Sequence, residues 1–234
     1  MPAWWVCPED PKAAVLVLPE VFGLNAWVRT VAERLAQQGY AALAISTFSR
    51  TAPDLDVGYD EAGLLAGREH RDLVRADQLL LDVDGAIAWL QRTPAAALPV
   101  GCVGFCFGGH LAMLAATHPQ IAATCDFYGA RVSCFKPGEP GATTLELASQ
   151  IPGRLWCFCG SADPLIPAEE LAAIEAALQQ ANGGLDPASE EARHRLTLAT
   201  GAGHGFMCEA RSDFHPEASA AGWKSMLKLF AESL

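Results

Sequence analysis

Short apolar runs alternate with longer amphipathic stretches along almost the whole chain, and this alternation restricts the fold more than any other feature of the sequence. The apolar runs have the length of strands, and we predict strands at 13–18, 41–46, 100–104, 121–127, 155–159 and 195–198. The stretches between them place apolar side chains on one helical face, and we predict helices at 25–38, 75–91, 108–117, 168–180 and 216–234. Strands that alternate with helices form a mostly parallel sheet with helices on both faces. The sequence therefore predicts an α/β fold.

The 234 residues suit one α/β domain, and we expect a single domain over 1–234. Three segments rich in Pro, Gly and polar residues interrupt the regular pattern and are predicted loops: 50–67, 131–151 and 182–193. We expect the segment 131–151 to lie over the mouth of the functional site.

Acidic residues outnumber basic ones by 27 to 16, and the formal net charge is −11. Nucleic acids and anionic lipids attract clusters of Lys and Arg, so we expect neither as a partner. The chain is 51% hydrophobic and 18% charged, a balance that excludes an intrinsically disordered protein. No apolar run approaches the length of a membrane span, and the first residues lack the pattern of a signal peptide. We therefore expect a cytoplasmic protein with no membrane partner.

Eight cysteines occur, without a CxxC pair and without an HExxH pattern, so we expect no metal site and no cofactor. Four of the cysteines fall in predicted strands and are expected to be buried: Cys102, Cys125, Cys157 and Cys159. Three others fall in loop-like segments: Cys7, Cys134 and Cys208. Disulfides are not expected in the cytoplasm.

The remaining cysteine, Cys106, lies in the turn Gly104-Phe-Cys-Phe-Gly-Gly109, between a predicted strand and a predicted helix. This is the context of a nucleophile elbow, G-x-S-x-G, with Cys in place of Ser. The nucleophile there sits on a sharp, strained turn, and the flanking glycines leave room for it. The N-terminus of the following helix favours the thiolate form of Cys106. The alternative is a glycine-rich turn with a buried cysteine.

Two further residues lie just past the ends of predicted strands. Asp163 follows the strand 155–159, and His204, between two glycines, follows the strand 195–198. Taken alone, Asp163 also fits a turn residue or the N-cap of the next helix, and His204 also fits an ordinary loop histidine. Together with Cys106 they give the order nucleophile, acid, base, which is the order found in α/β-hydrolases. The sequence thus predicts a Cys-His-Asp catalytic triad.

The chain resembles the dienelactone hydrolase family, the cysteine branch of the α/β-hydrolases, over nearly its whole length. The likeness rests on four motifs: Leu18-Pro-Glu-Val-Phe-Gly-Leu-Asn25, Gly104-Phe-Cys-Phe-Gly-Gly109, Gly160-Ser-Ala-Asp163 and Gly203-His-Gly-Phe206. The resemblance implies an α/β-hydrolase fold and a role for Glu20 in setting the ionisation of the nucleophile. It also implies that the backbone N–H groups of Val21 and Phe107 form the oxyanion hole.

One feature departs from the family pattern. Arginines hold the carboxylate of the substrate in founding members, one of them four residues after the catalytic His, and that position is Cys208 here. Arg211, three residues further on, is one candidate replacement. Arg68, Arg71 and Arg75 lie in the stretch where the other arginine would fall, although they also fit a solvated helix face. Tyr128 and Phe206 lie near the motifs and are candidate walls of the substrate pocket, or members of the core.

These observations predict a hydrolase that cleaves an ester, with a lactone such as dienelactone as the expected substrate, through a thioester acyl-enzyme. A thiolate leaves more easily than an alkoxide, which favours substrates with a stabilised enolate leaving group. The alternatives are a general carboxylesterase or thioesterase on the same triad, a catalytically silent ligand-binding protein, and a redox protein that uses Cys208 as a second thiol. The expected partner is a small-molecule ester or lactone. We expect a monomer, with a dimer as the alternative.

Overall fold

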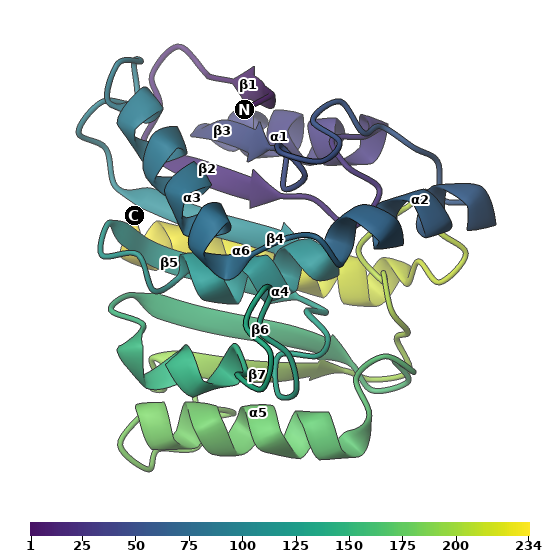
Figure 1. Ribbon diagram of the computed structural model, residues 1–234. Helices are drawn as coiled ribbons and strands as arrows, with labels where there is room; N and C mark the ends of the chain where they lie inside the picture. The colour runs from purple at the N-terminus through teal and green to yellow at the C-terminus, as the bar shows by residue number, and fades with distance from the viewer.

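The computed structural model describes residues 1–234, and its centre is one seven-stranded sheet (Figure 1). The strand order is β1-β3-β2-β4-β5-β6-β7. Six strands are parallel: β2 (Ala13–Leu18), β3 (Tyr40–Ile45), β4 (Val100–Phe105), β5 (Ile121–Phe127), β6 (Arg154–Gly160) and β7 (His194–Ala199). The edge strand β1 (Ala3–Val6) runs antiparallel to β3. The prediction of a mostly parallel α/β sheet is confirmed.

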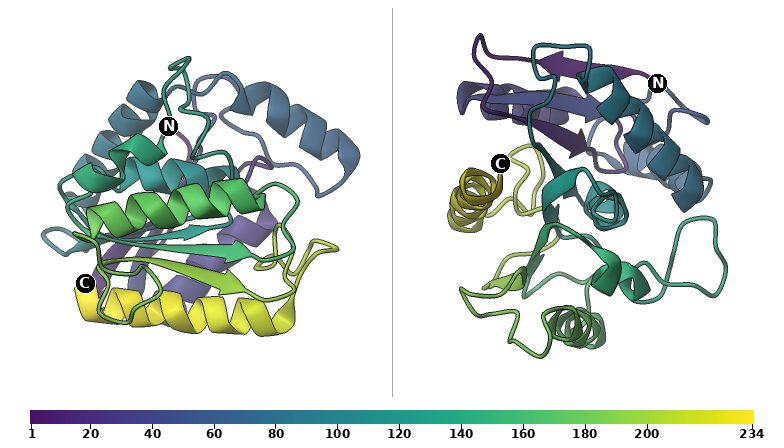
Figure 2. Two further views of the ribbon diagram at one scale, coloured as in Figure 1. Left: turned by 90° about the horizontal axis from the view of Figure 1, so that it is seen from below. Right: turned by 90° about the vertical axis from the view of Figure 1, so that its left-hand side faces the viewer.

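Helices cover both faces of the sheet. Figure 2 shows α1 (Ala26–Gln37) and α6 (Pro216–Ser233) on one face, and α3 (Ala76–Leu90) and α4 (Phe107–Ala115) on the other. The helix α5 (Ala168–Ala181) packs against β7 and the short 3-10 helix η1 (Leu145–Gln150). Every residue of β2, β3 and β4 is buried, as expected for strands covered on both faces. No helix has both the length and the apolar character needed to cross a bilayer.

Two elements differ from the sequence prediction. The first is α2 (Glu61–Arg71), part of which we had predicted as a loop because of its glycines. Asp60 caps this helix by accepting the N–H of Gly63 at 2.7 Å. Gly67 allows α2 to approach the chain beside β2, because a Cβ there would come within 2.0 Å of the Val21 carbonyl oxygen. These glycines serve close packing, a use that looks the same in sequence as a turn.

The second unpredicted element is β1, whose four residues are too few to show a period in the sequence. The segment 131–151 is mostly irregular but ends in η1, and 182–193 contains no helix or strand, as predicted. The carboxyl ends of β2, β4 and β6 meet at the edge of the sheet near α2 (Figure 1). Ligand sites of open parallel sheets form at such an edge.

Candidate active site

Cys106 occupies a sharp turn between β4 and α4. Its backbone has φ +55° and ψ −119°, a conformation that non-glycine residues adopt only at a cost of order 1–3 kcal/mol. The neighbours are glycines because nothing larger fits: a Cβ at Gly104 would lie 1.9 Å from the Gly108 carbonyl oxygen. A Cβ at Gly108 would lie 2.2 Å from the Leu18 carbonyl oxygen. The strand–turn–helix context of a nucleophile elbow is therefore present, and the half-buried thiol of Cys106 lies at its apex.

His204 and Asp163 form a buried pair beside this turn. Nδ1 of His204 lies 2.7 Å from Oδ2 of Asp163, and the other carboxylate oxygen accepts the backbone N–H of Leu165 at 2.8 Å. The carboxylate is an acceptor, so Nδ1 carries the hydrogen and Nε2 is left to exchange protons with other groups. Burial by itself lowers the pKa of His204. The negative charge of Cys106 and the bond to Asp163 outweigh that effect and raise the pKa to about 10. This favours the protonated, imidazolium form of His204.

Glu20 follows β2 and is fully buried beside the same site. Its Oε1 accepts a hydrogen bond from Nη1 of Arg211 at 3.1 Å, and Arg211 also binds Asp213. Burial raises the pKa of Glu20, and the guanidinium of Arg211 opposes the rise. Gly205 makes room for this arginine, because a Cβ there would lie 2.4 Å from its Nε.

Cys106 and His204 share the wall of a cavity of about 120 Å³. The other lining residues are Val21, Arg68, Arg71, Phe107, His110, Ala130, Arg131, Phe135 and Leu165. The backbone N–H groups of Val21 and Phe107 donate no hydrogen bond to another group of the chain. Two unpaired donors next to a nucleophile are the requirement for stabilising an oxyanion.

The remaining candidates from the sequence occupy different places. Arg68 lines the cavity, whereas Arg211 is not among the lining residues and is engaged by Glu20. Tyr128 and Phe206 are buried behind His204, with the Tyr128 ring edge-on to the imidazole at a centroid distance of 5.2 Å. They support the imidazole rather than face the cavity.

Arg71, one helical turn beyond Arg68, also lines the cavity, whereas Arg75 does not. Sequence reasoning missed two ionisable lining residues, His110 and Arg131. A signal existed for both, because His110 is one turn beyond Cys106 and Arg131 follows the carboxyl end of β5, where site residues are expected.

All eight cysteines are free thiols, and the four in strands are buried as predicted. Cys208 contradicts the expectation of an accessible loop thiol. It is fully buried, and burial together with the nearby Glu20 raises its pKa to about 12. A resolving role for this thiol is therefore not supported. Only Cys134 is fully exposed, while Cys7 and Cys106 are half-buried.

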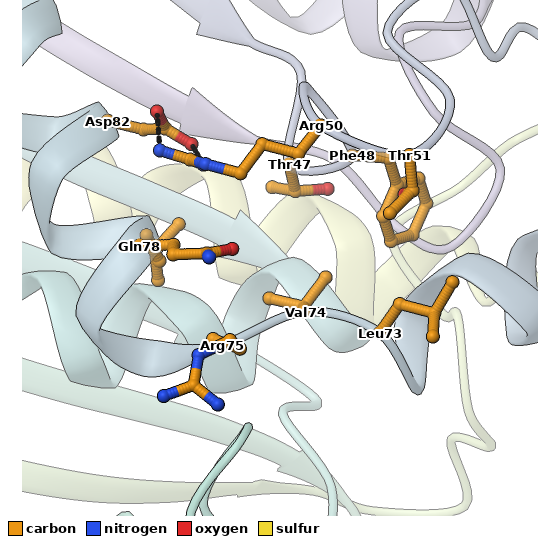
Figure 3. A pocket seen from close by; sticks show the side chains of 10 residues that line it. Thr47, Phe48, Arg50, Thr51, Leu73, Val74, Arg75, Gln78 and Asp82 are labelled. Atoms are coloured by element: carbon orange, nitrogen blue, oxygen red, sulfur yellow. Dashed lines mark hydrogen bonds and ion pairs between the residues drawn. The ribbon is translucent and has the colours of Figure 1, made fainter.

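A second hollow lies between the end of β3 and the start of α3 (Figure 3). Its volume of about 20 Å³ is that of a single water site. Arg50 and Asp82 form a bidentate pair on its wall, with Nη2 of Arg50 2.9 Å from Oδ1 of Asp82. The arginine is neutralised there, and no group of His, Cys, Asp and Glu side chains in the protein is placed to hold a metal ion.

The whole chain, residues 1–234, matches the model of the dienelactone hydrolase family. A protein of Synechocystis named "Putative carboxymethylenebutenolidase" is 36% identical over 223 residues, covering 94% of this chain and 86% of the relative. The chain belongs to the dienelactone hydrolase family. Membership confirms the predicted family and makes the protein a hydrolase of carboxylic esters.

Two other similar proteins agree with membership of the dienelactone hydrolase family. A crystal structure titled as a putative dienelactone hydrolase from Klebsiella pneumoniae has a TM-score of 0.85 at 29% identity. It covers 99% of this chain and 93% of its own. A Bradyrhizobium protein named "Probable 2-oxo-3-(5-oxofuran-2-ylidene)propanoate lactonase" is 29% identical, over 92% of this chain and 81% of its own.

Proposed function

We propose that this dienelactone hydrolase family member cleaves an ester, in the first place a lactone, with Cys106 as nucleophile, His204 as acid and base, and Asp163 as its orienting partner. The observation that carries the proposal is the cavity itself. It brings a strained thiol, a histidine oriented by a buried carboxylate, and two unpaired backbone N–H groups onto one wall.

The reaction follows from the protonation states. The Cys106 thiolate attacks the carbonyl carbon, and the negative charge moves onto the carbonyl oxygen, where the N–H groups of Val21 and Phe107 stabilise it. Each such donor lowers the barrier by about 3 kcal/mol. The imidazolium of His204 then gives its Nε2 proton to the departing oxygen as the C–O bond breaks. In a lactone this opens the ring and leaves an acyl thioester on Cys106.

Deacylation uses the same groups. Neutral His204 takes a proton from water, the hydroxide attacks the thioester carbonyl, and the C–S bond breaks to release a carboxylic acid and the thiolate. Asp163 holds the imidazole through Nδ1 and stabilises its cation. A thiolate departs more readily than an alkoxide, so the first intermediate tends to return to substrate. Lactones with an enolate leaving group avoid this return, because an enolate is itself a good leaving group.

The charges around the cavity favour a substrate with an anionic group. Arg68, Arg71 and Arg131 all line it, and guanidinium groups bind carboxylates in paired hydrogen bonds. The name of the Bradyrhizobium relative describes a lactone that carries a carboxylate, which agrees with such a substrate. A general carboxylesterase is the second candidate, favoured by the apolar wall of Phe107, Phe135 and Leu165.

The proposed role of Glu20 is to control the ionisation of Cys106 from its buried position. It holds a charge close to the nucleophile, and Arg211 holds that carboxylate in place. Glu20→Gln keeps the shape and removes the charge. We expect it to change the pH–rate profile and the rate of thiol alkylation, and an unchanged profile would leave Glu20 with a structural role only.

The test is ring opening of cis- and trans-dienelactone, followed by ultraviolet absorbance, for the wild type, Cys106→Ala and Cys134→Ala. Cys134 is the exposed thiol outside the cavity and serves as the control. We expect turnover by the wild type and the control, none by Cys106→Ala, and a mass increase of one acyl group at Cys106 in quenched samples. Full activity of Cys106→Ala would refute the proposed nucleophile. No turnover of either lactone, together with hydrolysis of uncharged esters, would favour the carboxylesterase.

A further inference from the structure

The segment 130–144 forms one wall of the active-site cavity. It leaves the end of β5 and returns just before η1, and it contributes Ala130, Arg131 and Phe135 to the lining. Several contacts hold Arg131 at this wall of the cavity.

Arg131 has an unfavourable backbone conformation that the surroundings must enforce. Its φ is +68°, the left-handed region, which costs a non-glycine residue of order 1 kcal/mol or more. Its carbonyl oxygen accepts the N–H of Phe135 at 3.0 Å, and its guanidinium lies 4.7 Å from the centre of the Phe135 ring. Glu170, at the start of α5, accepts the N–H of Ser133 at 3.4 Å. The arginine is thus held by several separate contacts.

A further constraint comes from α4, the helix that follows Cys106. His110 lies one turn after Cys106 and donates its N–H to the Cys106 carbonyl oxygen at 3.1 Å. Its side chain is buried, with Nδ1 2.9 Å from the Ala130 carbonyl oxygen and Nε2 2.7 Å from Oγ1 of Thr144. One imidazole therefore joins the two ends of the segment 130–144 to α4.

The partners determine where the hydrogens lie. A carbonyl oxygen only accepts, so Nδ1 carries the hydrogen. Burial and the nearby charge of Arg131 lower the pKa of His110 to about 4, against the bond to Ala130 that raises it. The ring is therefore neutral at pH 7, Nε2 accepts, and the Thr144 hydroxyl donates to it. The carbonyl oxygen of Phe135 also lies 3.2 Å from that hydroxyl. It still accepts a hydrogen bond from the backbone N–H of Thr144, at 3.2 Å.

We propose that His110 is a positioning residue that fixes the segment 130–144 against the nucleophile helix, and that Arg131, held there, selects substrates with a negatively charged group. The inference rests on the proposed function for its substrate and on the contacts of His110 for its mechanism. Asp72, the residue that follows α2, is exposed and paired with Arg71.

The test compares two buried threonines. Thr144→Val removes the hydroxyl that His110 binds, and Thr144→Ser keeps it. Thr124→Val is the matched control, because the hydroxyl of Thr124 is also buried but has no hydrogen-bond partner. The substrates are the 4-nitrophenyl monoester of succinate, which carries a carboxylate, and 4-nitrophenyl butyrate, which does not. Arg131→Gln is measured beside them.

We expect Arg131→Gln to raise KM for the succinate ester about tenfold more than it raises KM for the butyrate ester, the equivalent of one charge-assisted hydrogen bond. Thr144→Val raises KM in the same direction for the succinate ester alone, with kcat on butyrate unchanged. Thr144→Ser and Thr124→Val behave as the wild type. Hydrogen exchange of 131–143 is faster in Thr144→Val than in Thr124→Val.

The positioning role of His110 and the charge selection by Arg131 can be refuted separately. Equal exchange rates in the two valine variants would refute the positioning role of His110, whatever the enzyme hydrolyses. An equal effect of Arg131→Gln on both esters would refute charge selection. Failure of the wild type on both esters would contradict the proposed function, and the exchange measurement would still decide the positioning role.

Discussion

The buried pair of Glu20 and Arg211 allows a quantitative test of how the site is stabilised. The side chain of Glu20 is completely buried and that of Arg211 is 18% exposed, and 3.1 Å separate the two groups. Arg211→Met keeps much of the volume and leaves the carboxylate in the interior without its cation. Breaking a buried pair in this way costs about 3–5 kcal/mol. For a chain of this size that corresponds to a fall in Tm of roughly 6–20 °C.

The assay is urea unfolding of the wild type, Glu20→Gln, Arg211→Met and the double variant at pH 7, arranged as a double-mutant cycle. We expect the double variant to be more stable than Arg211→Met, because it contains no unpaired buried carboxylate. Lowering the pH should also reduce the loss of stability caused by Arg211→Met, since protonation neutralises Glu20. If Arg211→Met unfolds within 1 kcal/mol of the wild type, the reasoning about this pair is wrong.

Three further predictions follow from the site and its supports. Asp163→Asn should fold normally and lose about 10⁴-fold in kcat, because the amide no longer holds the required tautomer of the histidine; a loss below tenfold in steady-state kinetics would contradict this. Gly67→Ala should destabilise the protein and lower its activity, because the new methyl group clashes with Val21. Gly85→Ala should stabilise the protein by about 0.5–1 kcal/mol, because Gly85 is an exposed helical position with open space around it. Thermal unfolding measures both effects. Between pH 7 and 4.5 the free energy of unfolding of the wild type should fall by roughly 2 kcal/mol relative to that of His110→Gln. The histidine titrates near 6.5 in the unfolded state and near 4 in the folded state, so the unfolded state binds more protons in this range. Parallel curves of unfolding free energy against pH would show that His110 is not buried in its neutral form.

The sequence predicts the sheet well because parallel strands are buried on both faces. Strands such as β2 appear as continuous apolar runs, and five of the six α-helices were predicted from the spacing of their apolar side chains. The first part of α2, up to Gly67, was predicted as a loop, because the glycine that fits against Val21 cannot be distinguished in sequence from a turn glycine. Contacts made across the fold explain that error.

The candidate site also combines residues that have a local sequence signal with residues that only long-range contacts bring into place. Cys106, Asp163 and His204 each follow a strand in a glycine-marked turn, so the local sequence carries the signal. The place of Arg211 depends on the path of the chain after His204, and its partner Glu20 is 191 residues away in sequence. Arg131 and His110 meet through the segment 130–144, whose course only the folded structure shows.

Main-chain packing and side-chain contacts both support this site, and they respond differently to amino-acid substitution. Cys106, the proposed nucleophile, and the proposed oxyanion donors are held by main chain packed on main chain, at glycines where no other residue fits. The segment 130–144 is tied to α4 by one imidazole and can be redesigned by exchanging side chains. The proposed chemistry thus depends on close main-chain packing, and the proposed recognition depends on side chains that can be exchanged. An engineer who wishes to alter substrate preference can work on that segment and leave the reacting groups untouched.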